Sequence, residues 1–368
     1  MRVLQVIGAM DRGGAETLIM NLYRNVDRTK VQFDFLVNEN KVCDYDSEIE
    51  SLGGRLFRIP RYKIANYLEY KASCKAFFDS NPYKVVHGHI GLPASIYLRE
   101  ASRSGAFTIA HSHAQNYPLS PGEIVFRICS LPVRREADFF LACSQDAGRD
   151  RFGDKIVASS SFHVLKNGVD AENMAFDSNR RSLIRAELDI DEGAPVFGHV
   201  GRLTEVKNHK FLLDVFEIVH HAVPSSKLLL VGKGELENEL RKIVEVKGLS
   251  DSVLFVGLRE DVSSLLSAMD VFLFPSFSEG LSCAVIEAQT SGLPVLLSTG
   301  VPESAAILPS AERLDLSMGA PVWAKRALGM FEEHRDSDRG SAKLSVLDAG
   351  FDIKESASWI QELYLQHA

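Results

Sequence analysis

Long apolar runs, paired cysteines and leader-like patterns are all missing from this sequence, and each absence excludes a class of protein. No apolar run approaches the roughly 18 to 20 residues of a membrane-spanning helix; the strongest, 228–231 and 271–274, have the length of strands. The five cysteines are widely spaced without a Cys-x-x-Cys pair, which argues against a disulfide framework and a thiolate metal site. The first apolar stretch is too short for a signal peptide and runs into Asp11 and Arg12. We therefore expect a cytoplasmic protein.

Two nucleotide-binding signatures are missing as well. Gly8, Gly13 and Gly14 do not fit the Gly-x-Gly-x-x-Gly dinucleotide fingerprint, and no P-loop Lys-Ser/Thr follows them. This makes a dehydrogenase a distant candidate. Internal repeats and low-complexity segments are also lacking.

What is present is an average globular composition. The chain has 368 residues, 45% hydrophobic and 24% charged, with a mean hydropathy of −0.03, which predicts a folded protein of about two domains. Residues 1–170 hold 22 Lys and Arg against 19 Asp and Glu, and the remainder holds 19 against 30, giving +3 and −11. The overall acidity argues against nucleic-acid binding, while the first half can face an anionic surface; chance drift of charge is the plain alternative.

Short apolar runs alternate with amphipathic stretches, which predicts an α/β fold with parallel sheets. We expect strands at 2–7, 32–37, 55–59, 85–87, 108–111 and 139–142, and again at 196–200, 227–231, 253–256, 271–274 and 295–297. An Asn167-Gly168 turn signal marks the boundary between domains 1–168 and 169–353. The helical stretch 354–368 can pack back on the first domain. Two such doubly wound domains would bind ligands in a cleft at the carboxyl ends of their strands.

Three segments carry chemistry. Gly13 and Gly14 lead into a helix and allow close approach of an anion to its N-terminus, although a plain tight turn explains them equally well. In the second domain, Gly201-Arg202 follows a strand and Lys207 opens the next helix, so two cations suited to a diphosphate share one strand end; surface charge is the alternative. Further on, a strand ends before Glu279-Gly280-Leu281-Ser282 and a helix that contains Glu287. Carboxylates placed there can accept hydrogen bonds from sugar hydroxyls, and the helix N-terminus can hold phosphate.

Gly201-Arg202 with Lys207, and Glu279 and Glu287 in a Glu-x7-Glu element, resemble the retaining glycosyltransferases of family 4. The similarity also includes Gly13-Gly14, Asn167-Gly168-Val169-Asp170 and Gly232-Lys233-Gly234-Glu235, and it is closest to the bacterial exopolysaccharide and capsule subgroup. The resemblance implies a GT-B fold, with two Rossmann-like domains facing across a cleft. It further implies an acceptor-binding N-terminal domain and a C-terminal domain that binds a nucleotide-sugar, with UDP as the expected nucleotide.

The same resemblance assigns roles to individual residues. Arg202 and Lys207 would bind the donor diphosphate, Glu279 the donor sugar hydroxyls and Glu287 the ribose, with Gly280, Leu281 and Ser282 lining the donor site. Gly13 and Gly14 would line its phosphate side, and His113 would be the histidine near the reacting sugar. Three further histidines compete with His113 for that role: His111, His87 and His89.

The implied chemistry is electrostatic and needs neither a cofactor nor a metal. Cations and a helix dipole stabilise the leaving diphosphate, while the family implies a same-face route; a transient covalent intermediate stays open. Three Asp-x-Asp pairs, at 44–46, 189–191 and 336–338, are read as chance in an acidic chain. The acceptor would be a glycan or a polyprenyl-diphosphate-linked sugar, which fits surface-polysaccharide synthesis.

A membrane face is a separate expectation. Residues 122–135 mix bulky apolar side chains with Arg127, Arg134 and Arg135, a pattern suited to peripheral contact with anionic lipid at the inner face of the cell membrane. A core-facing helix is the plain alternative. For the whole chain, the alternatives to a transferase are a sugar-nucleotide epimerase or hydrolase, and a non-catalytic nucleotide-sugar-binding partner protein.

Overall fold

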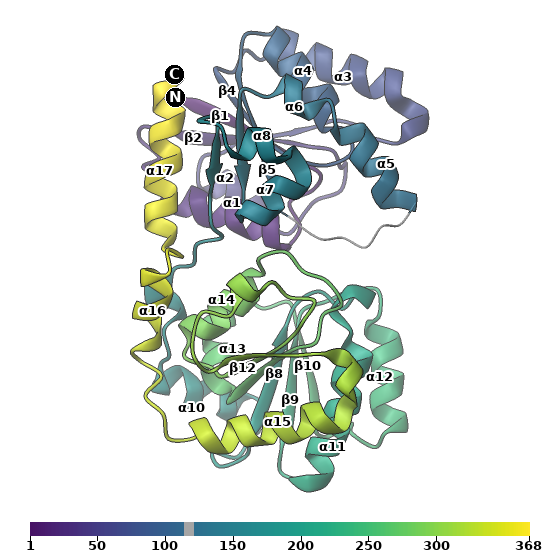
Figure 1. Cartoon of the computed structure of the whole chain (residues 1–368), viewed down its shortest axis with the longest axis vertical. Coiled ribbons are helices and arrows are strands. Elements are labelled where there is room, and N and C mark those ends of the chain that lie inside the picture. The colour runs from purple at the N-terminus through teal and green to yellow at the C-terminus, as the bar shows by residue number, and fades with distance from the viewer. Residues whose placement is uncertain (114–120) are drawn as a thin grey trace. The chain divides into compact units, whose positions relative to one another are not determined.

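The computed structural model describes residues 1–113 and 121–368, which divide into two compact units (Figure 1). The N-terminal unit comprises Met1–Gly168 together with Ile353–Ala368, and the C-terminal unit comprises Val169–Asp352. The chain therefore returns to its first unit at the end.

In the described part of the N-terminal unit, a seven-stranded parallel sheet has the order β3-β2-β1-β4-β5-β6-β7. Its strands are mostly continuous apolar runs, as expected for a parallel sheet that is covered on both faces. Their bounds are β1 (Arg2–Ile7), β2 (Gln32–Val37), β3 (Leu56–Arg58), β4 (Val85–His89), β5 (Phe107–Ser112), β6 (Phe139–Ala142) and β7 (Phe162–Val164).

Helices pack on both faces of this sheet. The C-terminal helix α17 (Ile353–Gln366) packs on α1 (Gly14–Asn25), and both contribute to one core with the odd-numbered apolar residues of β1 and β2. On the opposite face, Tyr97 of α4 (Ala94–Arg103) fills the space beside Gly88, where a Cβ would come within 2.5 Å of its ring. The other helices are α2 (Asp46–Ser51), η1 (Ile64–Asn66), α3 (Tyr67–Ser80), α5 (Pro121–Ser130), α6 (Val133–Glu136), α7 (Gln145–Phe152) and α8 (Asp154–Val157).

The C-terminal unit contains a six-stranded parallel sheet with the order β10-β9-β8-β11-β12-β13. Its strands are β8 (Val196–Val200), β9 (Lys227–Val231), β10 (Val253–Gly257), β11 (Val271–Phe274), β12 (Val295–Ser298) and β13 (Ala311–Leu314). Its helices are α9 (Ala171–Met174), α10 (Ser178–Glu187), η2 (Glu205–Lys207), α11 (His209–Ala222), α12 (Glu237–Val246), α13 (Val262–Ala268), α14 (Cys283–Thr290), η3 (Glu303–Ala305), η4 (Leu316–Met318), α15 (Gly319–His334) and α16 (Ala342–Asp348).

The α/β class and the two doubly wound sheets confirm the fold expected from the sequence. Of the edge strands, β13 was not expected, and β7 was expected only as a strand-like run ahead of the Asn167-Gly168 turn. Each is short and only half-buried, so it lacks the apolar run that marks a central strand. Among the described helices, none combines the length and the apolar character needed to cross a membrane.

Candidate functional site

The strand order of the C-terminal unit reverses between β8 and β11, the place where open α/β sheets bind ligands. Gly201 and Arg202 directly follow β8, Lys207 ends η2, and Glu279 lies in the loop after β11. The sheet therefore brings together Lys207 and Glu279, which are 72 positions apart in the sequence.

Two glycines of the loop after β9 pack closely against the backbone of the loop after β8 and hold it in place. Gly232, at φ +134°, is so close to it that a Cβ would lie 2.1 Å from the carbonyl oxygen of Gly201. A Cβ on Gly234 would lie 2.3 Å from the carbonyl oxygen of Leu203, whose own N–H donates to the carbonyl of Lys233 at 3.0 Å. These two positions therefore require glycine, and the contact holds the Arg202 turn in place.

Lys207 and Glu279 form an ion pair, with 2.7 Å between Nζ and Oε1 and side-chain exposures of 17% and 12%. The Lys207 Nζ also lies 4.6 Å from the centroid of the Phe274 ring. The backbone N–H of Phe277 donates to the carbonyl of Val206 at 2.8 Å, which ties the two loops together. The family resemblance assigned Lys207 to the diphosphate and Glu279 to the sugar; the structure shows the two side chains in contact, so each orients the other.

Arg202 and Lys233 are exposed cations beside this pair. Within residues 1–113 and 121–368, neither side chain has a hydrogen-bond or ion-pair partner. Sequence reasoning gave Lys233 no role, although a lysine between two glycines at the end of a buried strand is a signal that could have identified it.

The remaining predicted donor residues surround the start of α14. Ser282 is the N-cap, one residue after the buried Leu281, so the helix begins close to the position expected. The N–H of Glu279 donates to the carbonyl of Gly300 at 3.1 Å, which anchors the loop ahead of Gly280. Glu287 lies in the second turn and is 8% exposed.

A buried histidine connects the two strands at the switch point. His199 of β8 donates from Nδ1 to the carbonyl of Leu273 in β11 at 2.9 Å. Burial and the neighbouring His209 hold the pKa of His199 well below its usual value, so the ring is neutral. His199 therefore positions the Gly201 turn without adding charge to it.

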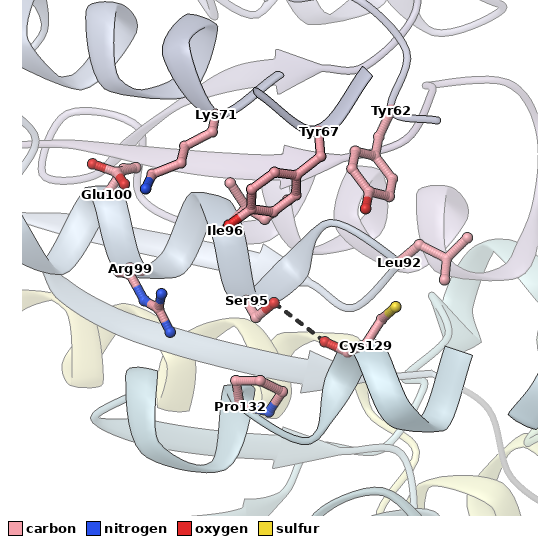
Figure 2. A pocket seen from close by; sticks show the side chains of 10 residues that line it. All are labelled: Tyr62, Tyr67, Lys71, Leu92, Ser95, Ile96, Arg99, Glu100, Cys129 and Pro132. Carbon is pink, nitrogen blue, oxygen red and sulfur yellow. Dashed lines mark hydrogen bonds between the residues drawn. The ribbon is translucent and has the colours of Figure 1, made fainter. Parts of the chain in front are cut away.

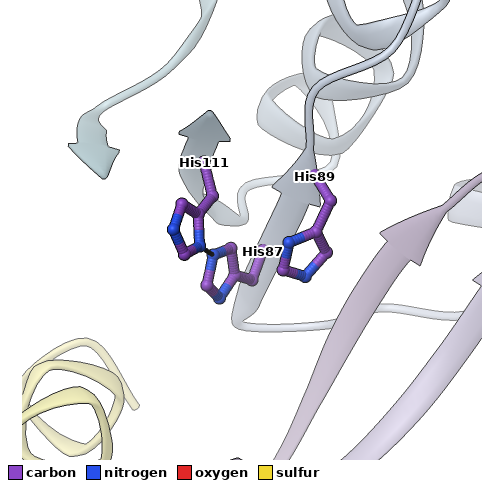
Figure 3. Close-up of side chains that lie close together, drawn as sticks. All are labelled: His87, His89 and His111. Carbon is purple, nitrogen blue, oxygen red and sulfur yellow. Dashed lines mark hydrogen bonds between the residues drawn. The ribbon is translucent and has the colours of Figure 1, made fainter. Parts of the chain in front are cut away.

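Four histidines line neighbouring strands of the N-terminal unit. His87 and His89 belong to β4, and His111 lies opposite His89 in β5 (Figure 3); His113 directly follows β5. The rings of His111 and His113 lie 4.1 Å apart between centroids, and those of His89 and His113 lie 5.0 Å apart. All four candidates for the single histidine expected from the sequence are thus in one cluster.

Burial keeps these rings neutral. Loss of solvation lowers the pKa of His87 to about 3 and that of His113 to about 4. The pKa values of His89 and His111 are held well below the usual range by burial and by the neighbouring rings. At neutral pH the cluster therefore acts through hydrogen bonds and lone pairs, without charge.

One group among the described residues has the arrangement of possible metal ligands: His87, His89 and His111, with ring nitrogens within 4.8 Å of one another. Several of these nitrogens already have hydrogen-bond partners: His87 Nε2 and His111 Nδ1 are 3.1 Å apart (Figure 3), and His89 Nδ1 lies 2.7 Å from His113 Nε2. The three Asp-x-Asp pairs are elsewhere, and Asp46 in the first of them is paired with Arg58. Whether the chain needs a metal stays a prediction.

The glycine pair of the N-terminal unit lies at the start of α1. Gly13 is the N-cap in an extended conformation, and a Cβ placed there would meet only the end of the Glu16 side chain. A Cβ on Gly14 would meet nothing within 4 Å. The space at Gly14 leaves room for a ligand, but the backbone geometry does not by itself require glycine.

The segment expected to face a membrane forms α5 and α6, and four of its apolar side chains are exposed, whereas Val133 is buried. The exposed set consists of Ile124, Val125, Ile128 and Leu131, at 37–62% exposure. A core-facing helix is therefore wrong for these residues. Of the three arginines, Arg127 pairs with Asp150 at 2.6 Å and Arg134 donates to the carbonyl of Arg151, whereas Arg135 is exposed.

A cavity of about 310 Å³ opens between α3, α4 and the end of α5 (Figure 2). Tyr62, Tyr67 and Leu92 line it together with Lys71 and Arg99. Arg99 is ion-paired with Glu136 at 2.6 Å. Near its lining residue Tyr67 in the sequence, Ile64 of η1 and Leu68 of α3 are 63% and 78% exposed.

Taken together, the two units offer different chemistry. The strand ends of the C-terminal unit present exposed cations, an oriented carboxylate and a helix N-terminus, which suit a diphosphate joined to a hydroxylated group. Those of the N-terminal unit present neutral ring nitrogens, which suit hydroxyl groups.

Comparison with known proteins identifies the family to which the chain is similar. The family described as "Glycosyltransferase Family 4" matches residues 12–173, and "Glycosyl transferases group 1" matches residues 180–312. The putative glycosyltransferase EpsF of Bacillus subtilis is 34% identical over 369 residues, covering 99% of this chain and 96% of that protein.

An Escherichia coli protein, named UDP-Gal:alpha-D-GlcNAc-diphosphoundecaprenol alpha-1,3-galactosyltransferase, is 36% identical over 303 residues, covering 77% of this chain and 78% of its own. Among solved structures, Anabaena Alr3699/HepE in complex with UDP-glucose has a TM-score of 0.80 over both complete chains, at 18% identity. The fold of that protein is thus the fold of this one. The chain belongs to the glycosyltransferases of family 4 and has the GT-B fold.

Proposed function

We propose that this glycosyltransferase moves a hexose or N-acetylhexosamine from a UDP-sugar to a glycan or lipid-linked oligosaccharide, with retention at the anomeric carbon, in surface-polysaccharide synthesis. The observation that carries the proposal is the pair of exposed cations, Arg202 and Lys233, beside the oriented Lys207–Glu279 pair. The E. coli relative is named for a UDP-sugar and a diphosphoundecaprenol acceptor, and a Staphylococcus aureus relative, CapH, for capsular polysaccharide biosynthesis at 22% identity.

The proposed reaction breaks the bond between the anomeric carbon and the leaving phosphate oxygen. Arg202, Lys207 and the N-terminus of α14 stabilise the negative charge that develops on the diphosphate. Glu279 accepts hydrogen bonds from the sugar hydroxyls and Glu287 from the ribose. The acceptor oxygen forms its bond on the same face, and its proton passes to the leaving phosphate oxygen. Protein cations supply the positive charge, so we propose that turnover needs no divalent metal.

The N-terminal unit is proposed to bind the acceptor and to rest peripherally on anionic lipid. We define the apolar surface as the exposed apolar side chains of η1, the start of α3, and α5 with the residue after it; these are Ile64, Leu68, Ile124, Val125, Ile128 and Leu131. Such a surface near Lys71 and Arg135 fits a bilayer with anionic headgroups.

Thermal stabilisation in EDTA, with UDP, GDP, CMP and NAD compared separately, tests the donor proposal. A true ligand at a hundredfold excess over its dissociation constant stabilises the fold by about 2.7 kcal/mol. We expect a shift with UDP. A shift with GDP alone would replace UDP in the proposal, and no shift with any nucleotide would favour a non-catalytic protein.

Turnover with UDP-sugars in EDTA, followed by NMR of the product's anomeric proton, tests the reaction. Retention and the need for an added glycan acceptor support the proposal. An inverted product would contradict the same-face route, and turnover without any acceptor would indicate an epimerase or hydrolase. Activity lost in EDTA and restored by magnesium or manganese would contradict metal independence.

A further inference from the structure

A continuous chain of hydrogen bonds connects helix α17 to the histidine cluster, entirely within the N-terminal unit. It joins side chains from β1, β4, β5 and α17 that lie up to 359 positions apart in the sequence. In order along the chain of bonds these are His113, His89, Gln5, Tyr364, His87 and His111. Gln5, His87, His89, His111 and Tyr364 are each at most 5% exposed, so water does not compete for these bonds.

The single proton of Tyr364 sets the direction of the bonds. Its Oη lies 2.6 Å from His87 Nδ1 and accepts a hydrogen bond from Gln5 Nε2 at 3.3 Å. Because an amide nitrogen can only donate, the phenol oxygen is the acceptor toward Gln5, and the phenol proton goes to His87 Nδ1.

From Gln5 the direction passes to His113. The Gln5 Oε1 can only accept, so His89 donates to it from Nε2 at 2.9 Å. A neutral His89 then has a bare Nδ1, which accepts from His113 Nε2 at 2.7 Å. His113 is therefore protonated at Nε2 and carries its lone pair at Nδ1.

The arm that runs from Tyr364 through His87 to His111 ends in a hydrogen-bond donor instead of an acceptor. His87 is protonated at Nε2 and donates to His111 Nδ1 at 3.1 Å, which leaves the proton of His111 on Nε2. In the part of the chain that the structure describes, His113 Nδ1 and His111 Nε2 are buried atoms with no hydrogen-bond partner. The cluster thus ends in one unused acceptor and one unused donor on neighbouring rings.

We propose that Tyr364 and Gln5 are positioning residues that fix His113 in the Nε2-protonated form, so that its Nδ1 accepts a hydrogen bond from a hydroxyl of a bound sugar. A buried acceptor needs a partner, and a hydroxyl is the group that a sugar brings. His111 Nε2 offers the complementary donor. This inference rests on the proposed function only in naming the ligand as a sugar; the tautomer is a property of the free protein.

NMR of the full-length protein with ¹⁵N-labelled histidine tests the tautomer directly, without substrate. Long-range correlations between ring protons and ring nitrogens distinguish an Nε2–H from an Nδ1–H ring, and His113→Asn identifies the signal. We expect Nε2–H at His113 in the native protein. An Nδ1–H ring at His113 would overturn the proposal.

Tyr364→Phe keeps the ring in the core but removes the hydroxyl that accepts from Gln5 Nε2 and so fixes which end of the Gln5 amide faces His89. We expect His113 in this variant to become a mixture of tautomers, whereas Tyr70→Phe, which removes a buried hydroxyl bonded to Asn38 at 2.9 Å, leaves it unchanged. An unchanged His113 in Tyr364→Phe would overturn the role of Tyr364. The same spectra recorded after EDTA treatment test a metal: a change, with one equivalent of metal released, would overturn the hydrogen-bond assignment.

Kinetics then test the role of the lone pair. We expect Tyr364→Phe to lower kcat about tenfold or more while UDP affinity stays within twofold of native, with Tyr70→Phe as the control. The expected tautomers with unchanged kcat in Tyr364→Phe would overturn the sugar contact while leaving the transferase proposal intact. Absence of transfer in the native protein, with the tautomers as expected, would instead contradict the proposed function.

Discussion

The two units repeat one architecture, a doubly wound parallel sheet, but they place opposite chemistry at the carboxyl ends of their strands. In the C-terminal unit these ends carry Arg202, Lys233 and the Lys207–Glu279 pair. In the N-terminal unit the corresponding positions carry neutral, buried histidines. The fold supplies an edge where loops meet, and the side chains placed there decide whether the edge suits a charged or a hydroxylated ligand.

Acid should have the largest effect, because it should destabilise the N-terminal unit more than the C-terminal unit. An unfolded histidine takes up a proton near pH 6.5, whereas the folded pKa values of His87 and His113 are about 3 and about 4. The unfolded state binds more protons, so the free energy of unfolding falls as the pH drops below 6.5, by roughly 2 kcal/mol per neutral ring at pH 5. The N-terminal unit holds four such rings and the C-terminal unit two, His199 and His209, so the N-terminal unit should unfold first.

Pulsed hydrogen exchange at one fixed pH, after equilibration at pH 4–7, reports on each unit separately through its peptides. His87→Asn should make the N-terminal unit less sensitive to acid, and His199→Asn is the matched change in the C-terminal unit. Simultaneous loss of protection in both units of the native protein would show that they do not unfold independently.

The next largest effect should come from removing a carboxylate that pairs with a buried arginine in the C-terminal unit. Asp270 accepts hydrogen bonds from Arg181 and Arg185, each at 2.8 Å, and the Arg185 side chain is 1% exposed. Asp270→Ala leaves a buried guanidinium uncompensated and should lower the free energy of unfolding by about 3–5 kcal/mol. In the exposed Lys75–Asp79 pair, Asp79→Ala should cost below ~1 kcal/mol. Urea unfolding of both variants measures the difference, and equal costs would contradict it.

Within the site, two changes should separate the diphosphate from the sugar. Arg202→Ala removes a charged contact and should weaken UDP and UDP-sugar binding alike, by about 1.5–3 kcal/mol. Glu279→Ala should reduce discrimination among sugars while sparing UDP. Calorimetric titration measures both, with Arg241→Ala, an exposed arginine of α12 paired with Glu237, as the control. Unchanged UDP affinity in Arg202→Ala would refute its assigned role.

The smallest effect concerns the apolar surface of the N-terminal unit. Ile128→Ser and Leu68→Ser remove side chains that are 62% and 78% exposed and should each weaken binding to anionic vesicles by about 1 kcal/mol. Leu183→Ser, at 70% exposure in α10 of the C-terminal unit, should have no effect. Flotation with phosphatidylglycerol vesicles measures this, and failure of the native protein to float would remove the membrane from the proposal.

Much of this protein could be predicted from its sequence. The buried strands are continuous apolar runs, so their positions and parallel arrangement were predicted from the alternation with helices, whereas the strand order within each sheet and the half-buried edge strand β13 were not. Family membership was predicted from Arg202, Lys207, Glu279 and Glu287, because these residues lie in local motifs whose spacing can be recognised in a single sequence.

Tertiary structure alone decided how those residues meet. Only the sheet brings Lys207 to Glu279, and only the return of α17 to the first unit brings Tyr364 to Gln5 and the histidines. A spacing motif describes neighbours along the chain, whereas the direction of a hydrogen bond depends on which donor and acceptor face each other in space. The sequence therefore determined the family and the candidate site residues, and the fold decided which of their donor and acceptor atoms face each other.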